Sequence, residues 1–120
     1  MRVALLVTAC LVATAARAGG DAERARQAYE ARCGACHSVD ADRVGPRHAG
    51  IIGRKAGSVP GFAYSDALRN SGLFWDRMLL DRWLADPEAL VPGQRMGYRI
   101  DDAQVRAEII DYLATLGPAP

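Results

Sequence analysis

The short stretch CGACH, Cys33 to His37, constrains this chain more than any other feature. It places two cysteines three positions apart and a histidine directly after the second. Three chemistries use cysteines at such close spacing: a disulfide redox pair, a zinc site, and covalent attachment of haem. The rest of the sequence has to decide among them.

The N-terminal residues have the pattern of a secretory signal peptide. A positive charge at Arg2 precedes an almost wholly apolar run over residues 3–16, and an A-x-A cleavage sequence ends at Ala18. The run is short for a membrane span, which needs roughly 20 apolar residues. We expect a cleaved signal peptide at residues 1–18, one domain at residues 19–120, and export to the periplasm. An uncleaved membrane anchor is the alternative.

Charge and cysteine count narrow the classes of partner and chemistry. Two of the 15 basic residues and none of the 14 acidic ones precede the cleavage site, so the mature chain carries a net charge of −1. Duplex binding needs a concentrated positive face, so nucleic acid is not an expected partner. The mature chain keeps only Cys33 and Cys36. A disulfide between them would close a trivial loop and hardly stabilise the fold, so the pair must serve another chemistry.

Apolar periodicity predicts an all-α fold. Asp21 is a candidate helix cap, and a stripe from Val105 to Leu116 marks the clearest helix, which Gly117-Pro118 ends. No convincing strand pair is found. We expect about four helices, over residues 21–32, 65–70, 76–85 and 101–116.

A long stretch rich in glycine and proline separates the first two helices, over residues 38–64. Loops of this length are uncommon in small domains, and four short helices make a poor core for about 100 residues. Both objections disappear if a large apolar cofactor fills the centre and the loops wrap around it.

The three chemistries fit the chain unequally. A thioredoxin-like pair would sit at a strand-to-helix turn, and His37 would have no explanation. A zinc site could use Cys33, Cys36, His37 and His48, but structural zinc usually takes two separated pairs of ligands. In haem attachment each thiol adds to one vinyl group, and the histidine after the second cysteine binds iron. This last interpretation explains every residue of the motif.

A second iron ligand is then expected on the opposite face of the haem. Met96 follows VPGQR in an irregular segment between two helices, where a turn would let its flexible side chain reach the iron. Met78 lies in a predicted helix and is expected to be core filler. His48 is the competing ligand, and a surface or propionate-bonded histidine is its other interpretation.

With these motifs in place, the mature chain resembles a class I cytochrome c, the small soluble mono-haem type of bacteria and mitochondria. The stretches that carry the resemblance, in family order, are YEARCGACH, VGPRHAGIIGRKAG, VPGFAYSDAL, LFWDRMLLDRWLADP and VPGQRM. The resemblance implies a mostly helical fold whose first and last helices cross, with one haem c bound covalently through Cys33 and Cys36 and ligated by His37 and Met96.

The resemblance also implies supporting roles. The Pro46 carbonyl would accept a hydrogen bond from His37 and make that ligand more basic. Arg54, Tyr64 and Trp75 would hold the haem propionates, and Trp83 stands where the family usually has a tyrosine near the methionine. Tyr29 and Tyr112 would pack where the terminal helices cross.

Several residues depart from the family pattern. Ala25 replaces a glycine at the helix crossing, His48 replaces an apolar loop residue, Leu68 replaces a polar residue beneath the haem, and Gln94 stands where a threonine often bonds a propionate. Trp83 and Leu68 remove hydrogen bonding near the methionine sulfur, so the reduction potential is expected to differ from that of well-known members.

We therefore predict a monomeric periplasmic single-electron carrier that is not an enzyme and binds no small-molecule substrate. Redox proteins would dock at the exposed haem edge, flanked by Arg32, Arg95 and Arg99. A haem enzyme such as a peroxidase would need an open iron position, which Met96 argues against. The alternative function is a dedicated electron-accepting cytochrome subunit of a periplasmic dehydrogenase, which would have the same fold and ligands.

Overall fold

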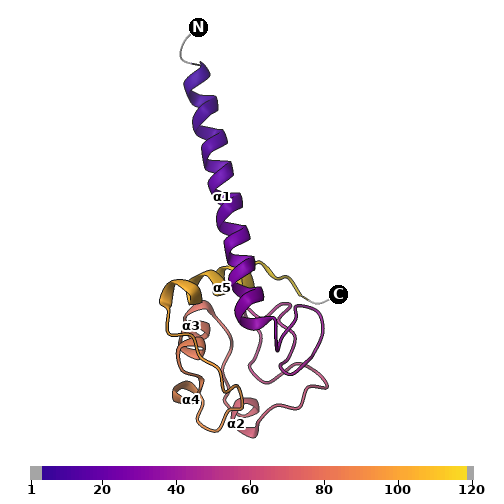
Figure 1. The fold of residues 1–120 in the computed structure, drawn as a ribbon. Helices are drawn as coiled ribbons and strands as arrows, with labels where there is room; N and C mark the ends of the chain where they lie inside the picture. Colours follow the sequence, from indigo (N-terminus) through magenta and orange to yellow (C-terminus); the bar gives the residue numbers. More distant parts are fainter. Residues whose placement is uncertain (1–3, 119–120) are drawn as a thin grey trace.

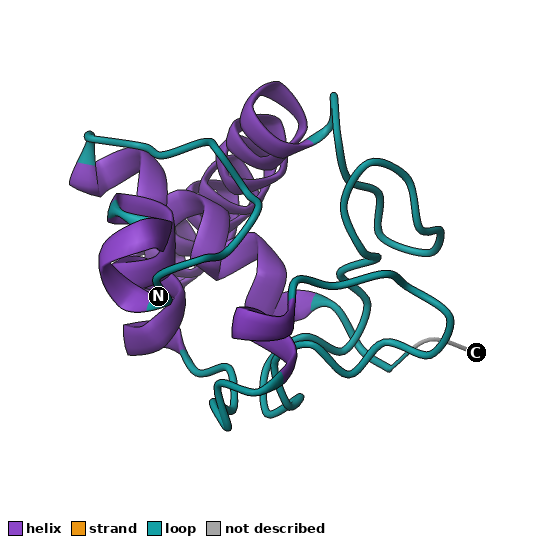
Figure 2. Cartoon of the chain, turned by 90° about the horizontal axis from the view of Figure 1, so that it is seen from below, coloured by secondary structure: helices purple, strands orange, loops and turns teal. Residues whose placement is uncertain are grey.

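The computed structural model describes the backbone of residues 4–118 and the side chains of residues 18–118. The described residues form five helices, which long loops join in chain order (Figure 1). In Figure 2 the helices gather on one side of the molecule and most of the loop lies on the other. The helices are α1 (Ala4–Cys33), α2 (Asp66–Arg69), α3 (Arg77–Ala85), α4 (Pro87–Leu90) and α5 (Ala103–Thr115).

The all-α prediction is confirmed for the described residues, in which the only β-type pairing is one isolated antiparallel bridge between Lys55 and Phe74. Short polar side chains begin each helix after the first. Ser65, Asp76 and Asp102 accept hydrogen bonds from backbone amides in the first turns of α2, α3 and α5. Such caps satisfy amides that have no partner within the helix, which is why the sequence marks these starts well.

The predicted start of the first helix at Asp21 is wrong in this structure. Helix α1 runs through Gly19 and Gly20, and Asp21 lies on its surface in an ion pair with Arg24 at 3.1 Å. The predicted signal peptide, residues 1–18, falls almost wholly on residues whose side chains lie outside the described part. Among the residues described, no helix combines the length and apolar character that a membrane span requires.

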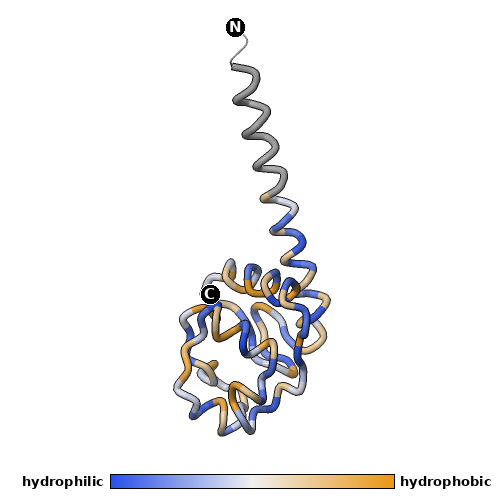
Figure 3. Tube along the Cα trace, turned by 90° about the vertical axis from the view of Figure 1, so that its left-hand side faces the viewer, coloured by the Kyte–Doolittle hydropathy of each residue, from blue (hydrophilic) through white to orange (hydrophobic). Residues whose placement is uncertain are grey.

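Helices α1 and α5 cross and pack against each other. Ala25 is buried at 6% exposure, and the rings of Tyr29 and Tyr112 meet with centroids 4.7 Å apart. Figure 3 shows apolar and polar residues alternating along both helices around this crossing. On α5, Ile109 and Leu113 are buried, as the apolar stripe predicted. The crossing therefore fixes the end of α1, and with it the cysteine motif.

Helix α3 also packs against α5 and supplies Leu80, Trp83 and Leu84 to the core. The expectation that Met78 is core filler is wrong, because its side chain is 67% exposed in the first turn of α3. Helix α4 was not predicted. It is a single short turn that Asp86 caps, and Pro87 occupies its start, where the missing amide hydrogen costs nothing.

Candidate haem site

The cysteine motif forms a turn at the end of α1. Cys33 is the last residue of the helix, and its carbonyl accepts hydrogen bonds from the amides of Cys36 at 3.1 Å and His37 at 2.8 Å. Both thiols are free; Cys33 is half-buried and Cys36 is exposed. Burial raises the pKa of the Cys33 thiol to about 12, so it is held as a neutral thiol. The turn from Cys33 to His37 therefore carries two thiols and one imidazole within five residues.

The two rival chemistries find no support in this arrangement. Across the described part of the chain, no group of three or more histidine, cysteine, aspartate or glutamate side chains converges as a metal site would require. The cysteine pair follows a helix rather than a strand, unlike a thioredoxin-type pair. The donors present, two thiols and one neighbouring imidazole, match covalent haem attachment.

The imidazole of His37 is oriented through its Nδ1 atom. Nδ1 donates a hydrogen bond of 2.8 Å to the Pro46 carbonyl, the bond that the family resemblance implied. Burial lowers the pKa of His37, the hydrogen bond to Pro46 partly opposes this shift, and the positive charge of Arg43 adds to it, so the ring is neutral near pH 7. A neutral ring that donates from Nδ1 keeps its lone pair on Nε2, the atom free to bind a metal.

Glycine at position 45 lets the loop approach this ring closely. A Cβ atom at Gly45 would lie 2.5 Å from both Nδ1 and Nε2 of His37, closer than real Cβ contacts allow. Equal distances to both nitrogens place that point over the face of the ring. The Gly45 backbone therefore packs directly on the imidazole, a constraint that the sequence alone did not reveal.

His48 lies beside His37 in the site, which contradicts its interpretation as a surface residue. Its ring stacks on His37 with centroids 4.1 Å apart and an interplanar angle of 18°. Its Nδ1 and the Tyr29 hydroxyl share a hydrogen bond of 2.9 Å. Burial lowers the pKa of His48 to about 3, with smaller contributions from His37 and Arg54. His48 is thus a neutral, half-buried residue that packs on His37.

Backbone hydrogen bonds fasten the loop that carries these residues to the cysteine motif. The amides of Gly45, His48 and Ala49 donate to the carbonyls of Cys36, Ser38 and Val39, at 2.9, 3.1 and 2.9 Å. The guanidinium of Arg43 donates to the Gly34 carbonyl at 2.6 Å, and more weakly to the carbonyls of Ala35 and His37. Arg43 was not predicted; an exposed arginine in a loop carries no pattern that indicates such a role.

Residues expected near the haem propionates gather around the isolated bridge. The Trp75 amide donates to the Arg54 carbonyl at 2.9 Å, and the Arg54 guanidinium donates to the carbonyls of Ala49 and Arg47 at 2.9 and 3.0 Å. Arg54 has five N–H groups, so further donors remain. The charge of Arg54 also acts on the Tyr64 hydroxyl, which accepts a hydrogen bond from the Val59 amide.

The two tryptophans meet in the core beside these residues. Trp75 and Trp83 are 6% and 8% exposed, and their rings are edge to face with centroids 5.4 Å apart. Edge-to-face pairs of this kind add to the stabilisation that burial gives. Arg54, Trp75 and Trp83 therefore form a connected set, with Tyr64 near its charged end.

Met96 lies in a segment that is anchored on both sides. On one side, Glu88 accepts hydrogen bonds from the Gly93 amide at 2.8 Å and the Gln94 side-chain amide at 3.1 Å. On the other, the Ile100 amide donates to the Leu84 carbonyl at 2.8 Å. The Met96 side chain is half-buried and packs against the hydrophobic core. The carbonyl oxygen of the Gln94 side chain is buried and has no protein partner.

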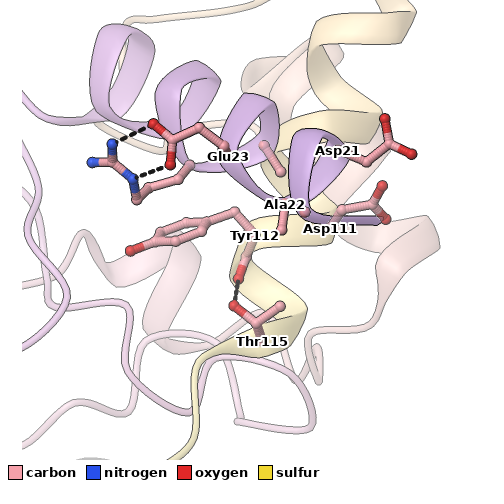
Figure 4. A pocket seen from close by; sticks show the side chains of 9 residues that line it. Asp21, Ala22, Glu23, Asp111, Tyr112 and Thr115 are labelled. Atoms are coloured by element: carbon pink, nitrogen blue, oxygen red, sulfur yellow. Dashed lines mark hydrogen bonds and ion pairs between the residues drawn. The ribbon is translucent and has the colours of Figure 1, made fainter. Parts of the chain in front are cut away.

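Two hollows in the described surface have no lining residue from the motif, and one of them, of about 350 Å³, is lined by Arg54 with Arg47 and Val59. The other, of about 420 Å³, lies in the groove between α1 and α5. Figure 4 shows Asp21, Glu23 and Asp111 at this groove, with Glu23 paired to Arg26. The Thr115 hydroxyl donates to the Tyr112 carbonyl at its rim. None of the predicted haem-contacting residues lines the groove, so we assign it no part in the site.

The residues present fit a covalently attached haem. They offer two free thiols, one imidazole with a free Nε2, a half-buried thioether and a partly buried apolar lining. An unpartnered buried oxygen at Gln94 lies next to the segment that carries the thioether. Leu68, Leu73 and Val39 are among the partly buried apolar side chains packed against the core.

Comparison with known proteins agrees with this assignment. Residues 22–117 match a family model described as Cytochrome c. The chain is 40% identical over 119 residues to cytochrome c2 of Rhodomicrobium vannielii, covering 96% of this chain and 94% of the relative. It is 48% identical over 89 residues to cytochrome c2 iso-2 of Magnetospirillum molischianum, covering 70% and 90%. The solved structure of cytochrome cH from Methylobacterium extorquens is similar, with 44% identity and a TM-score of 0.73 over 78% of this chain and 97% of that one.

Proposed function

Because the chain belongs to the cytochrome c family, we propose that it is a periplasmic carrier that moves single electrons between redox partners. The chain binds one haem c covalently through Cys33 and Cys36. When bound, the haem supplies one-electron chemistry between ferrous and ferric iron. The protein's contribution is to ligate the iron, exclude water and present one edge of the cofactor to partners.

The observation that carries the proposal is the hydrogen bond between His37 and Pro46. Nδ1 of His37 donates to the Pro46 carbonyl oxygen at 2.8 Å, so Nε2 remains as the ligand atom. Met96 is the proposed second ligand, on a segment anchored by Glu88 and by the Ile100 amide. Two protein ligands leave no vacancy for oxygen or peroxide, which favours an electron carrier over a haem enzyme. Thioether ligation favours ferrous iron and a positive potential.

Docking is proposed around the end of α1 and the segment after Met96. Arg32 is exposed at the end of α1, and its guanidinium lies 3.5 Å from the Tyr98 hydroxyl. Arg95 and Arg99 are exposed on the same segment as Tyr98. The Arg32–Tyr98 contact joins the end of α1 to the segment that carries Arg95 and Arg99, where Arg99 also pairs with Asp101 at 3.6 Å. A small positive patch supports weak, transient and moderately salt-sensitive encounters.

A reversible redox titration of the purified protein, followed by its visible spectrum, tests the proposal. We expect one transition that fits one electron, with a positive midpoint potential, and no binding of carbon monoxide to the ferrous form near neutral pH. Tight carbon monoxide binding would reveal an open iron position and contradict the carrier assignment. Cell fractionation and the intact mass test location: we expect a periplasmic chain that begins at Gly19 and carries one haem that acid–acetone does not extract.

A further inference from the structure

We propose that Tyr29 and His48 act as a polar pair that positions the imidazole of His37, and so help to set the reduction potential. The proposal deepens the proposed function and rests on it, because it requires His37 to bind the iron. Both residues are positioning residues, since neither needs to touch the cofactor to act.

The contacts run in a chain from α1 to the iron ligand. The His48 ring stacks on the His37 ring at 4.1 Å with nearly parallel planes. The other end of His48 is tied through Nδ1 to the Tyr29 hydroxyl at 2.9 Å. A hydrogen bond at Nδ1 fixes the tilt of the His48 ring as well as its place. His48 therefore presents a flat surface of defined orientation to His37.

Both members of the pair are held rigidly. Tyr29 is 4% exposed and packs against the ring of Tyr112 where α1 and α5 cross. Both backbone groups of His48 are hydrogen-bonded. Its amide donates to the Ser38 carbonyl at 3.1 Å, and its carbonyl accepts from the Ile51 amide at 3.1 Å. A small movement of His37 against His48 would thus have to displace the helix crossing or the loop.

This pair completes the set of contacts around His37. The Pro46 carbonyl holds the ring by its edge at Nδ1, and the Gly45 backbone lies against its face. Neither contact alone prevents the ring from tilting. With His48 stacked on it, the ring keeps the orientation in which the Nδ1 hydrogen bond is strong. A stronger bond at Nδ1 makes Nε2 a better donor to iron, which stabilises the ferric state and lowers the potential.

Three substitutions separate the stacking from the hydrogen bond. Tyr29→Phe removes the hydroxyl and keeps the stack. His48→Asn keeps an acceptor near the position of Nδ1 and removes the stack. The double variant Tyr29→Phe/His48→Leu removes both interactions. Tyr112→Phe is the matched control, because it removes a hydroxyl from the ring that packs against Tyr29 without touching His48.

The readouts are the midpoint potential and the g-values of the ferric protein by electron paramagnetic resonance, which report the orientation of the axial imidazole. We expect both single variants to raise the potential and shift the g-values, and Tyr112→Phe to change neither. The double variant should shift the potential and the g-values more than Tyr29→Phe alone, because it removes the stack as well as the hydrogen bond.

The outcomes against the proposal are distinct. Variants that lose stability in urea yet keep wild-type g-values and potential would show that the pair is only structural. If His48→Asn fails to fold, Tyr29→Phe alone decides, since it deletes one oxygen atom. A wild-type ferric protein without histidine ligation would defeat the proposed function itself. Unshifted variants of a normally ligated protein would defeat only the positioning role.

Discussion

Gly45 has to be a glycine because its backbone lies on the imidazole of His37. We predict that Gly45→Ala forces the ring or the loop to move, since the added methyl group would overlap Nδ1, Nε2 and Cε1. Overpacking of this kind costs about 1–3 kcal/mol. The cost should appear as a lower urea midpoint of the haem-loaded protein, together with a changed potential.

Gly117→Ala is the control for this prediction. A Cβ atom at Gly117 has open space around it, and the residue lies beyond the end of α5. Its substitution should leave both the urea midpoint and the potential unchanged. Equal effects of the two substitutions would mean that contact with His37 is not what excludes alanine at position 45.

For single residues, the sequence predicted chemistry that depends on near neighbours in the chain, but not contacts between residues far apart in the chain. The motif from Cys33 to His37 works through neighbouring residues, so spacing alone predicted which atoms it presents. The Tyr29–His48 hydrogen bond joins residues 19 positions apart, and no periodicity relates them. Met78 shows the same limit, because a helix pattern predicts that a residue is helical but not always which face meets the core.

Among the helices, Arg106 of α5 joins α3 to the segment that follows Met96. Its side chain is 13% exposed, pairs with Asp81 at 2.8 Å, and donates to the carbonyls of Ile100 and Asp101 at 2.9 Å each. Arg106→Gln should remove the ion pair with the Asp81 carboxylate and the hydrogen bonds to the carbonyls of Ile100 and Asp101. We predict a loss of about 1–3 kcal/mol in unfolding free energy, measured by urea titration.

Arg77 provides a matched comparison. It pairs with Asp111 between the same two helices, but both side chains are more than half exposed. Exposed pairs contribute about 0–1 kcal/mol, so Arg77→Gln should change the unfolding free energy little. If the two variants lost equal stability, burial of the Arg106 contacts would not be the source of their strength.

The Met96 segment contains no lysine that could replace its methionine at high pH. A lysine amine can bind iron once it is deprotonated, but residues 87–100 contain no lysine, and guanidinium groups stay protonated. Lys55 sits on the isolated bridge with Phe74, and its neighbour Ala56 donates to the Leu73 carbonyl at 2.8 Å. We predict that methionine ligation persists to higher pH than in relatives with a lysine in this segment, and that hydroxide finally replaces it.

An alkaline titration of the ferric protein, followed by its methionine–iron charge-transfer band, checks this prediction. His48 is not expected to compete, because it stacks on His37 and so lies on the side of the site opposite the proposed Met96 ligand. Lys55→Ala is the control and should not move the transition. An early loss of the band that Lys55→Ala abolishes would show that the remote lysine reaches the iron.

Element boundaries were predictable where a polar cap marks them and uncertain elsewhere. Ser65 and Asp76 cap α2 and α3 at the predicted starts, and Asp102 caps α5 one residue after the predicted start, because each side chain satisfies amides that the helix leaves open. Asp21 has the same chemistry but lies inside α1, where alanine-rich sequence on both sides continues the helix. Helix α4 is a single turn, too short for an apolar period to indicate it.

For the molecule as a whole, the arginine patch predicts how partners approach. Arg32→Glu with Arg95→Glu reverses two charges on the proposed docking face, and should slow electron transfer to a natural partner at low ionic strength. The difference from wild type should shrink as salt rises, because screening weakens the attraction. Stopped-flow kinetics over a series of salt concentrations measures both effects.

The control reverses two charges elsewhere. Arg24→Glu with Arg82→Glu changes the net charge equally; both residues are exposed, Arg24 eight residues before Arg32 on α1 and Arg82 on α3. We expect only a small effect on the rate. A slowing equal to that of the Arg32 and Arg95 pair would mean that net charge, and not this patch, governs the encounter.

We propose above all that His37 and Met96 are the two ligands of the haem iron. The most direct test is the methionine–iron charge-transfer band of the ferric protein, compared between wild type, Met96→Ala and Met78→Ala. The Met78 side chain is exposed on α3, so its loss should leave the band and the potential intact. We predict that Met96→Ala removes the band, opens the iron to added ligands and lowers the potential. A Met96→Ala protein with an unchanged band and potential would contradict it.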